Sequence, residues 1–146
     1  MKGRQAVKRL RNTNKPVLMI AEPDAEERSI LRAIVQVMGF EVRQALQRDQ
    51  LIKLCWLTPP DLLLLDLALP QLGGTDDAVG LLRRDLALPS LPIVALTDKG
   101  VTSNIPVPNR STVVLPKPVD FEKLSYLIDR LLPGRLSSLA NFQCLS

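Results

Sequence analysis

The chain has 146 residues, of which 46% are hydrophobic, and this is enough for one domain with a buried core. It contains no histidine, which excludes Ser-His-Asp and Cys-His catalysis, histidine-containing metal sites and a role as phosphohistidine carrier. Its two cysteines, Cys55 and Cys144, are too few for a disulfide framework and have no metal-binding spacing.

The net charge of +4 is concentrated at the N-terminus. Residues 1–15 contain six cations and no acid, whereas the rest of the chain has 13 cations and 15 acids. We predict a basic, disordered arm over residues 1–15. Such an arm offers a contact to nucleic acid or an anionic surface, but it has no aromatic residue to stack on bases. Because no apolar run is long enough for a membrane span or a signal peptide, a cytoplasmic location is expected.

From residue 16 onward, apolar runs alternate with helical patterns. The run PVLMIA at residues 16–21 predicts a buried strand. Asp24 then suits the N-cap of a helix, and Glu27, three residues later, completes an acidic variant of the capping box. A second strand is predicted at residues 41–45 and a second helix at residues 49–57.

Residues 62–65 are four leucines in succession, and Asp66 follows them. A run that is apolar at every position is typical of a central parallel strand, buried on both faces. Thr75 is predicted to cap a third helix. The fourth strand covers residues 91–96 and ends before Thr97.

The segment between residues 98 and 112 has no apolar stripe and contains two interior prolines. A regular helix is therefore not expected there, and the fourth helix of the pattern is predicted to be degenerate. A short strand at residues 113–115 precedes a last helix, which is capped by Asp120. The predicted domain spans residues 16–132, and residues 133–146 form a short tail.

Three other features have simple structural interpretations. Cys55 lies among apolar residues and is interpreted as a core residue. The single tryptophan, Trp56, is interpreted as a packing residue, and the pair Arg83 and Arg84 as a solvated helix face.

Polar side chains follow four of the predicted strands. Glu22 follows the first, Asp66 the third, Thr97 the fourth and Lys117 the fifth. In a parallel sheet of order 2-1-3-4-5 these strands are neighbours, so their carboxyl ends meet at one edge. A carboxylate that attacks phosphorus, further acids for a magnesium ion (Mg2+), a hydroxyl and an ammonium group together suit phosphoryl transfer.

Four stretches resemble, in order and spacing, the characteristic motifs of response-regulator receiver domains. They are VLMIAEPDAEER, PDLLLLDLALPQLGG, PIVALT and LPKPVD, and the resemblance covers residues 16–132. It implies an α/β fold of the flavodoxin-like, doubly wound kind, with a five-stranded parallel sheet and helices on both faces. It also implies a cis peptide bond between Lys117 and Pro118.

The same resemblance implies roles for individual residues. Asp66 would be the phosphoacceptor, and Thr97 and Lys117 would contact the phosphoryl group. Mg2+ would be held by Glu22, by Asp66 and by the backbone carbonyl of Ala68.

The chain departs from the family pattern after the first strand. Receiver domains carry two adjacent acids there, the second of which contacts the metal, and the two positions are Glu22 and Pro23 in this chain. Proline has no side-chain ligand atom. Asp24 is a candidate substitute one residue later, although it also suits the helix cap. In addition, Asp98 stands where the family prefers a small residue, and Val114 where it often has an aromatic one.

Two functional hypotheses follow from this pattern. In the first, the chain is a single-domain response regulator. It receives a phosphoryl group from a histidine kinase or a histidine phosphotransfer protein and signals through protein contacts. The alternative is a pseudo-receiver that acts as a protein interaction module independently of phosphorylation, as Pro23 and the degenerate fourth helix suggest. An enzyme in the usual sense is not expected.

Overall fold

The computed structural model describes residues 15–73, 78–98 and 112–132. In these segments the chain forms one parallel sheet of five strands, in the order β2-β1-β3-β4-β5. The strands are β1 (Val17–Ala21), β2 (Glu41–Ala45), β3 (Leu62–Asp66), β4 (Ile93–Thr97) and β5 (Thr112–Pro116). The helices are α2 (Ala25–Val37), α3 (Arg48–Leu57), α4 (Ala78–Leu86) and α5 (Phe121–Leu131).

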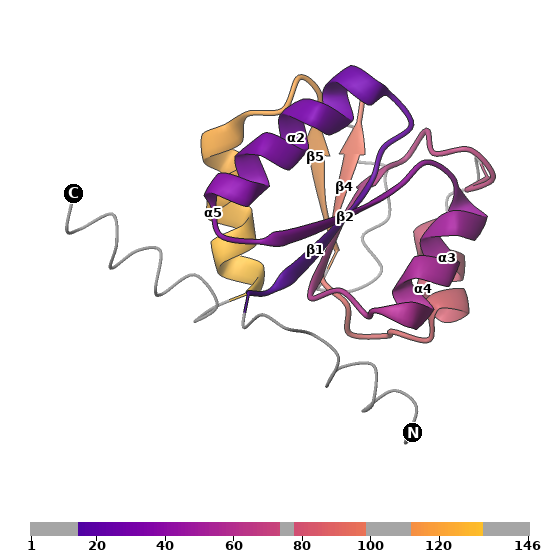
Figure 1. Cartoon of the computed structure of the whole chain (residues 1–146). Coiled ribbons are helices and arrows are strands. Elements are labelled where there is room, and N and C mark those ends of the chain that lie inside the picture. Colours follow the sequence, from indigo (N-terminus) through magenta and orange to yellow (C-terminus); the bar gives the residue numbers. More distant parts are fainter. Residues whose placement is uncertain (1–14, 74–77, 99–111, 133–146) are drawn as a thin grey trace.

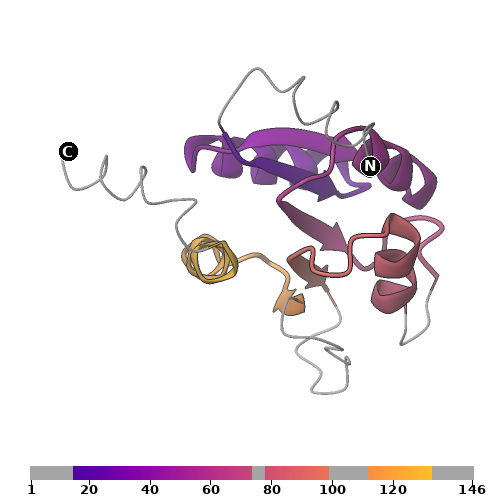
Figure 2. The same cartoon turned by 90° about the horizontal axis from the view of Figure 1, so that it is seen from below.

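The sheet forms the middle layer of three (Figures 1 and 2). Helices α2 and α5 cover one face, and α3 and α4 cover the other. The predicted flavodoxin-like, doubly wound architecture is therefore confirmed, including the strand order. No helix in the described segments is long and apolar enough to cross a membrane.

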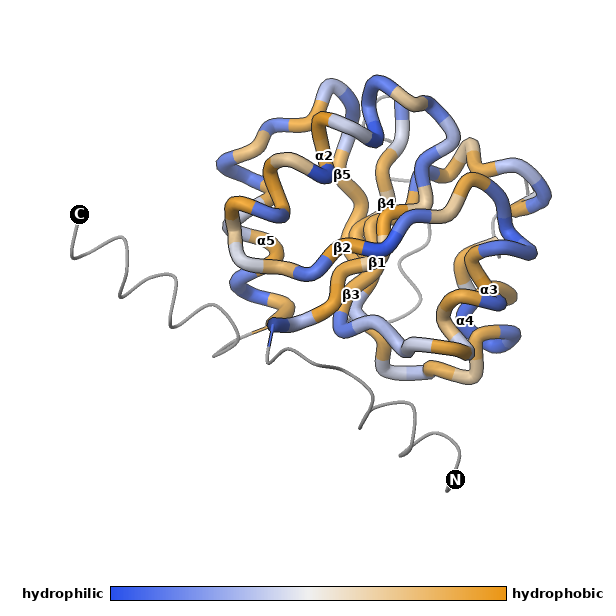
Figure 3. The backbone as a smooth tube through the Cα atoms, viewed as in Figure 1, coloured by the Kyte–Doolittle hydropathy of each residue, from blue (hydrophilic) through white to orange (hydrophobic). Residues whose placement is uncertain are grey.

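The central strands β1, β3 and β4 are largely hydrophobic along the tube coloured by hydropathy (Figure 3), and a cluster of buried apolar residues packs on each face of the sheet. In β1, Leu18 and Ile20 pack towards α2 and α5, whereas Met19 and Ala21 pack towards α3 and α4. All residues of β3 and β4 are buried, which explains why their sequences lack the alternation of a half-exposed strand.

The observed strands begin and end within two residues of their predicted positions. Helix α2 ends as a Schellman motif: Gly39 has a φ of 101°, and the N–H of Phe40 donates to the carbonyl of Val35. Cys55 is buried, as predicted. The predicted cap Thr75 and nearly all of the predicted arm, degenerate helix and tail lie outside the described residues.

Two interpretations from the sequence were wrong. Trp56 is 62% exposed at the end of α3 and is not a packing residue. Arg83 is buried, and only Arg84 lies on a solvated face. The Arg83 guanidinium donates to the carbonyls of Pro89 and Leu91 and to the hydroxyl of Thr112, and so joins α4 to the beginning of β5.

Candidate functional site

The carboxyl ends of four adjacent strands bring the predicted site residues to one edge of the sheet. Asp66 is the last residue of β3 and lies opposite Leu96, so the next residue, Thr97, ends β4 at the same level. Thr97 in turn lies opposite Pro116, and Lys117 follows directly. The N–H of Lys117 donates to the Thr97 carbonyl at 2.7 Å.

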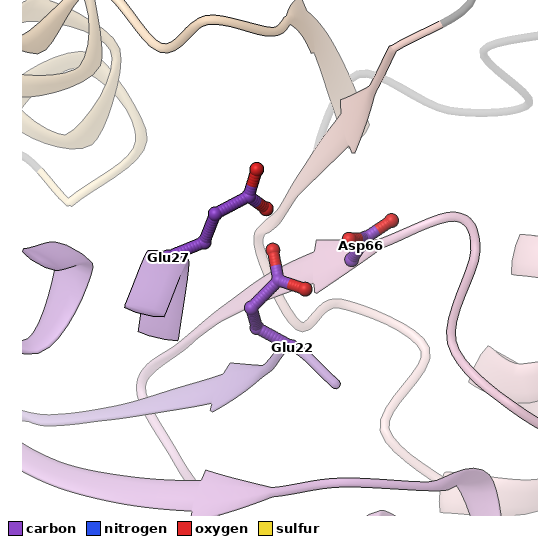
Figure 4. Close-up of side chains that lie close together, drawn as sticks. All are labelled: Glu22, Glu27 and Asp66. Carbon is purple, nitrogen blue, oxygen red and sulfur yellow. The ribbon is translucent and has the colours of Figure 1, made fainter. Parts of the chain in front are cut away.

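The ammonium group of Lys117 binds three carboxylates at once. Its Nζ lies 2.6 Å from Asp66 Oδ2, 3.0 Å from Glu22 Oε1 and 2.5 Å from Glu27 Oε2. Figure 4 shows the side chains of Glu22, Glu27 and Asp66 close together, where they come from the end of β1, the beginning of α2 and the end of β3. Residues 22 and 117 thus meet although 95 positions separate them.

The four side chains of this cluster, Glu22, Glu27, Asp66 and Lys117, range from buried to exposed. The side chain of Glu22 is 1% exposed and that of Asp66 6%, whereas Lys117 is 13% and Glu27 46% exposed. Ionising two adjacent carboxylates in a buried place is costly unless a cation lies between them. The ammonium group supplies that charge, and Glu27 contacts it from the solvent side.

Burial and the adjacent Asp66 raise the pKa of Glu22 from 4.5 to about 7, against the lowering effect of Lys117. For Asp66, burial alone would raise the pKa. Contacts with Glu22, Lys117 and the N–H of Ala68 outweigh it and lower the Asp66 pKa below its usual value. Burial would lower the pKa of Lys117, but the three carboxylates raise it above its usual value. Of the two buried carboxyl groups, Glu22 and Asp66, the latter is therefore the one that is mainly ionised, and Lys117 is a cation at neutral pH.

Backbone contacts hold Asp66 and Glu22 in place. The N–H of Ala68 donates to Asp66 Oδ1 at 2.8 Å, which leaves Oδ2 to Lys117. Arg28 Nη1 donates to the carbonyl of Glu22 at 2.8 Å and so fixes the turn between β1 and α2. The peptide bond between Lys117 and Pro118 is cis, as the family resemblance implied.

The acid at position 24 is engaged elsewhere. Asp24 Oδ1 accepts the N–H groups of Glu26 and Glu27, so it caps α2. The predicted capping box was wrong in its second half, because the N–H of Asp24 donates to Glu22 Oε2 and the Glu27 carboxylate binds Lys117 instead. Among the predicted site residues, Asp24 is the one whose carboxylate does not join the cluster.

Glu27 is the site residue that the sequence did not reveal as such. Its position in the first turn of α2 had an adequate explanation in the capping pattern. Its contact with Lys117 spans 90 residues, which no local pattern predicts.

The donor set of the cluster suits a divalent cation. One oxygen each from Glu22, Glu27 and Asp66 lies within 4.8 Å of the others among the described residues. All three are carboxylate oxygens, the type of ligand that Mg2+ prefers. The three carboxylates also bind the same ammonium group, so they already surround a position that holds a cation.

The sequence of residues 18–129 matches the response regulator receiver domain family. The chain belongs to this family. Receiver domains are normally non-catalytic modules of two-component signalling, and their partners are histidine kinases. No relative was found among curated protein sequences.

Solved structures of receiver domains share the fold. A protein assigned as a response regulator from Chloroflexus aurantiacus is 24% identical, with a TM-score of 0.70 over 81% of this chain and 98% of that one. The receiver domain of an HD-domain protein from Pseudomonas fluorescens is 17% identical, with a TM-score of 0.71 over 85% and 99%. The receiver domain of a sensor histidine kinase from Pseudomonas aeruginosa, with magnesium in its active-site cleft, is 20% identical, with a TM-score of 0.66 over 80% and 97%.

Proposed function

We propose that this chain is a cytoplasmic response-regulator receiver domain that accepts a phosphoryl group on Asp66. The observation that carries this proposal is the contact between Asp66 Oδ2 and the Lys117 ammonium at 2.6 Å, at the carboxyl edge of the sheet. A carboxylate with a lowered pKa is ionised at neutral pH and therefore available as a nucleophile. The donor would be a histidine kinase or a histidine phosphotransfer protein, since the chain has no histidine of its own.

In the proposed transfer, a carboxylate oxygen of Asp66 attacks the phosphorus of a phosphohistidine. The new bond joins this oxygen to phosphorus, the nitrogen–phosphorus bond of the donor breaks, and its electron pair returns to the imidazole. Lys117 is close enough to remain paired with the product and to bind a phosphoryl oxygen. Thr97, which is buried beside it at the end of β4, would donate its hydroxyl to the same group.

Mg2+, when bound, would offset charge on the phosphoryl oxygens. Glu22, Asp66 and the backbone carbonyl of Ala68 would hold it, and the N–H of Ala68 already orients the Asp66 carboxylate. The added negative charge would draw Lys117 from Glu22 and Glu27 towards the new group. We expect this rearrangement to alter the surface at the ends of β4 and β5, which a downstream protein would recognise.

One observation favours a second candidate, a receiver-like interaction module that does not depend on phosphate. Pro23 is exposed at the position where receiver domains carry a metal-binding acid, and Asp24 is engaged as a helix cap. In such a module the cluster around Lys117 would serve stability alone.

Labelling with acetyl phosphate and Mg2+ separates the two candidates. We expect the wild type to gain one phosphoryl group, Asp66→Asn to gain none, and the exposed control Asp129→Asn to behave as the wild type. Pro23→Asp should accelerate labelling, because it restores an acid beside Glu22. If neither the wild type nor Pro23→Asp is labelled, the interaction module is the correct reading.

A further inference from the structure

We infer that Glu27 is a positioning residue for Lys117: it takes over the ammonium group when a divalent cation binds Glu22 and Asp66. The inference rests on the proposed function only in assigning Glu22 and Asp66 as the cation-binding pair. It gives Lys117 a second role, as a tethered cation that competes with the metal ion for the same carboxylates.

The distances support this assignment. Lys117 Nζ lies 2.5 Å from Glu27 Oε2, closer than the 2.6 Å to Asp66 and the 3.0 Å to Glu22. The ammonium group is therefore bound at least as closely to the helix as to the buried pair. Glu27 can keep it when the other two contacts are lost.

The backbone of Lys117 limits where the ammonium group can go. Its N–H is bound to the Thr97 carbonyl at 2.7 Å, and Pro118 follows immediately, so the side chain begins from a fixed point at the sheet edge. A metal ion held by Glu22 and Asp66 would repel an ammonium group that is bound to the same two carboxylates. Entry of the metal ion therefore requires the ammonium group to move.

Glu27 offers the least costly destination for it. The Glu27 side chain is 46% exposed, so ionising it requires little desolvation, whereas Glu22 is 1% exposed. Retention on Glu27 would also keep Lys117 next to Asp66, ready for a phosphoryl oxygen. In this chain Pro23 replaces the second acid with which receiver domains usually bind the metal ion. With fewer carboxylate ligands, metal binding depends more on where Lys117 is held.

The alternative role for Glu27 is that of a direct metal ligand, and a double-mutant cycle distinguishes the two. Mg2+ affinity is measured by titration calorimetry, without any phosphoryl donor, for the wild type, Glu27→Gln, Lys117→Met and the double variant. The matched control is Glu26→Gln, which removes the same charge from the same turn of α2 at an exposed residue outside the cluster.

We expect Lys117→Met to bind Mg2+ about tenfold more tightly than the wild type, because a competing cation is removed. In the wild-type background, Glu27→Gln should weaken Mg2+ binding about fivefold. In the Lys117→Met background, Glu27→Gln should weaken it no more than Glu26→Gln does. Glu27→Asp, which keeps the charge, should recover part of the loss.

Three outcomes would overturn the inference. An equal loss from Glu27→Gln in both backgrounds makes Glu27 a metal ligand. A loss no greater than that of Glu26→Gln in the wild type leaves it without a role. Absence of Mg2+ binding by both the wild type and Lys117→Met removes the competition itself. Failure of acetyl phosphate labelling, by contrast, affects the proposed function and leaves this titration unchanged.

If Lys117→Met does not fold, Lys117→Gln replaces it in the cycle. Thermal unfolding without metal provides the second readout. Glu27→Gln should lower the unfolding temperature more than Glu26→Gln in the wild type, and by the same amount as Glu26→Gln when Lys117 is replaced. A loss from Glu27→Gln that still exceeds the loss from Glu26→Gln when Lys117 is replaced contradicts the inference.

Discussion

Replacing Glu22 by glutamine removes a buried ionisable group while keeping its size and its ability to accept a hydrogen bond. The pKa of Glu22 is raised from 4.5 to about 7, chiefly by burial and then by Asp66. In the unfolded chain the pKa returns to its ordinary value. Between pH 4.5 and 7 the folded protein therefore holds a proton on Glu22 that the unfolded chain releases.

The sign of the effect follows directly. The stability that the protonated Glu22 contributes is fully present below pH 4.5 and is lost as the pH rises through 7. The difference between the two pKa values corresponds to at most about 3 kcal/mol in the free energy of unfolding. Asp66 acts in a separate window, because its lowered pKa makes stability fall only below its ordinary value of 3.8.

The assay is urea unfolding followed by far-ultraviolet circular dichroism, in buffers with a metal chelator, from pH 4.5 to 8. The wild type should lose stability across this range relative to Glu22→Gln, by up to about 3 kcal/mol. Excess Mg2+ should reduce the loss, because a cation favours the ionised carboxyl group. Parallel curves for the two proteins would refute the reasoning, since Glu22 would then ionise alike in the folded and unfolded states.

Two further predictions concern the core. Arg83→Met should lower the free energy of unfolding by about 2 kcal/mol, because it leaves buried acceptors such as the Thr112 hydroxyl without a donor. Arg84→Met, at an exposed position, should change it by less than about 0.5 kcal/mol in the same urea titration. Burial raises the pKa of Cys55 to about 12, so in a Cys144→Ser background a thiol reagent at pH 8 should modify it at least about 100-fold more slowly than in the unfolded chain. Equal losses for the two arginines, or equal thiol rates, would contradict these predictions.

The fold was predictable because each strand carries its own signal. Residues 62–65 are apolar at every position, and a strand buried on both faces needs this. Asp24 and Asp120 mark the beginnings of α2 and α5, since their carboxylates accept backbone N–H groups at those points. Once the order of the strands was assumed, the convergence of Asp66, Thr97 and Lys117 followed from geometry.

The parts that escaped prediction depend on contacts between distant segments. Glu27 matched a local capping pattern, yet the charge of Lys117 attracts its carboxylate more strongly than the backbone N–H of Asp24 does. Arg83 stands four residues after Val79 and three before Leu86, so helical spacing puts it on the apolar face of α4, although the pair of Arg83 and Arg84 was interpreted as a solvated face. What the sequence did not reveal are the acceptors of the Arg83 guanidinium, the Leu91 carbonyl and the Thr112 hydroxyl, which come from other segments.

The central claim is that Asp66 is the residue that accepts the phosphoryl group. After incubation with acetyl phosphate and Mg2+, borohydride reduces an aspartyl phosphate to homoserine, and peptide mass spectrometry then locates the reduced residue. We predict homoserine at position 66 in the wild type and none in Asp66→Asn treated in the same way. Homoserine at another aspartate, or at none in a folded, Mg2+-saturated protein, would contradict the claim.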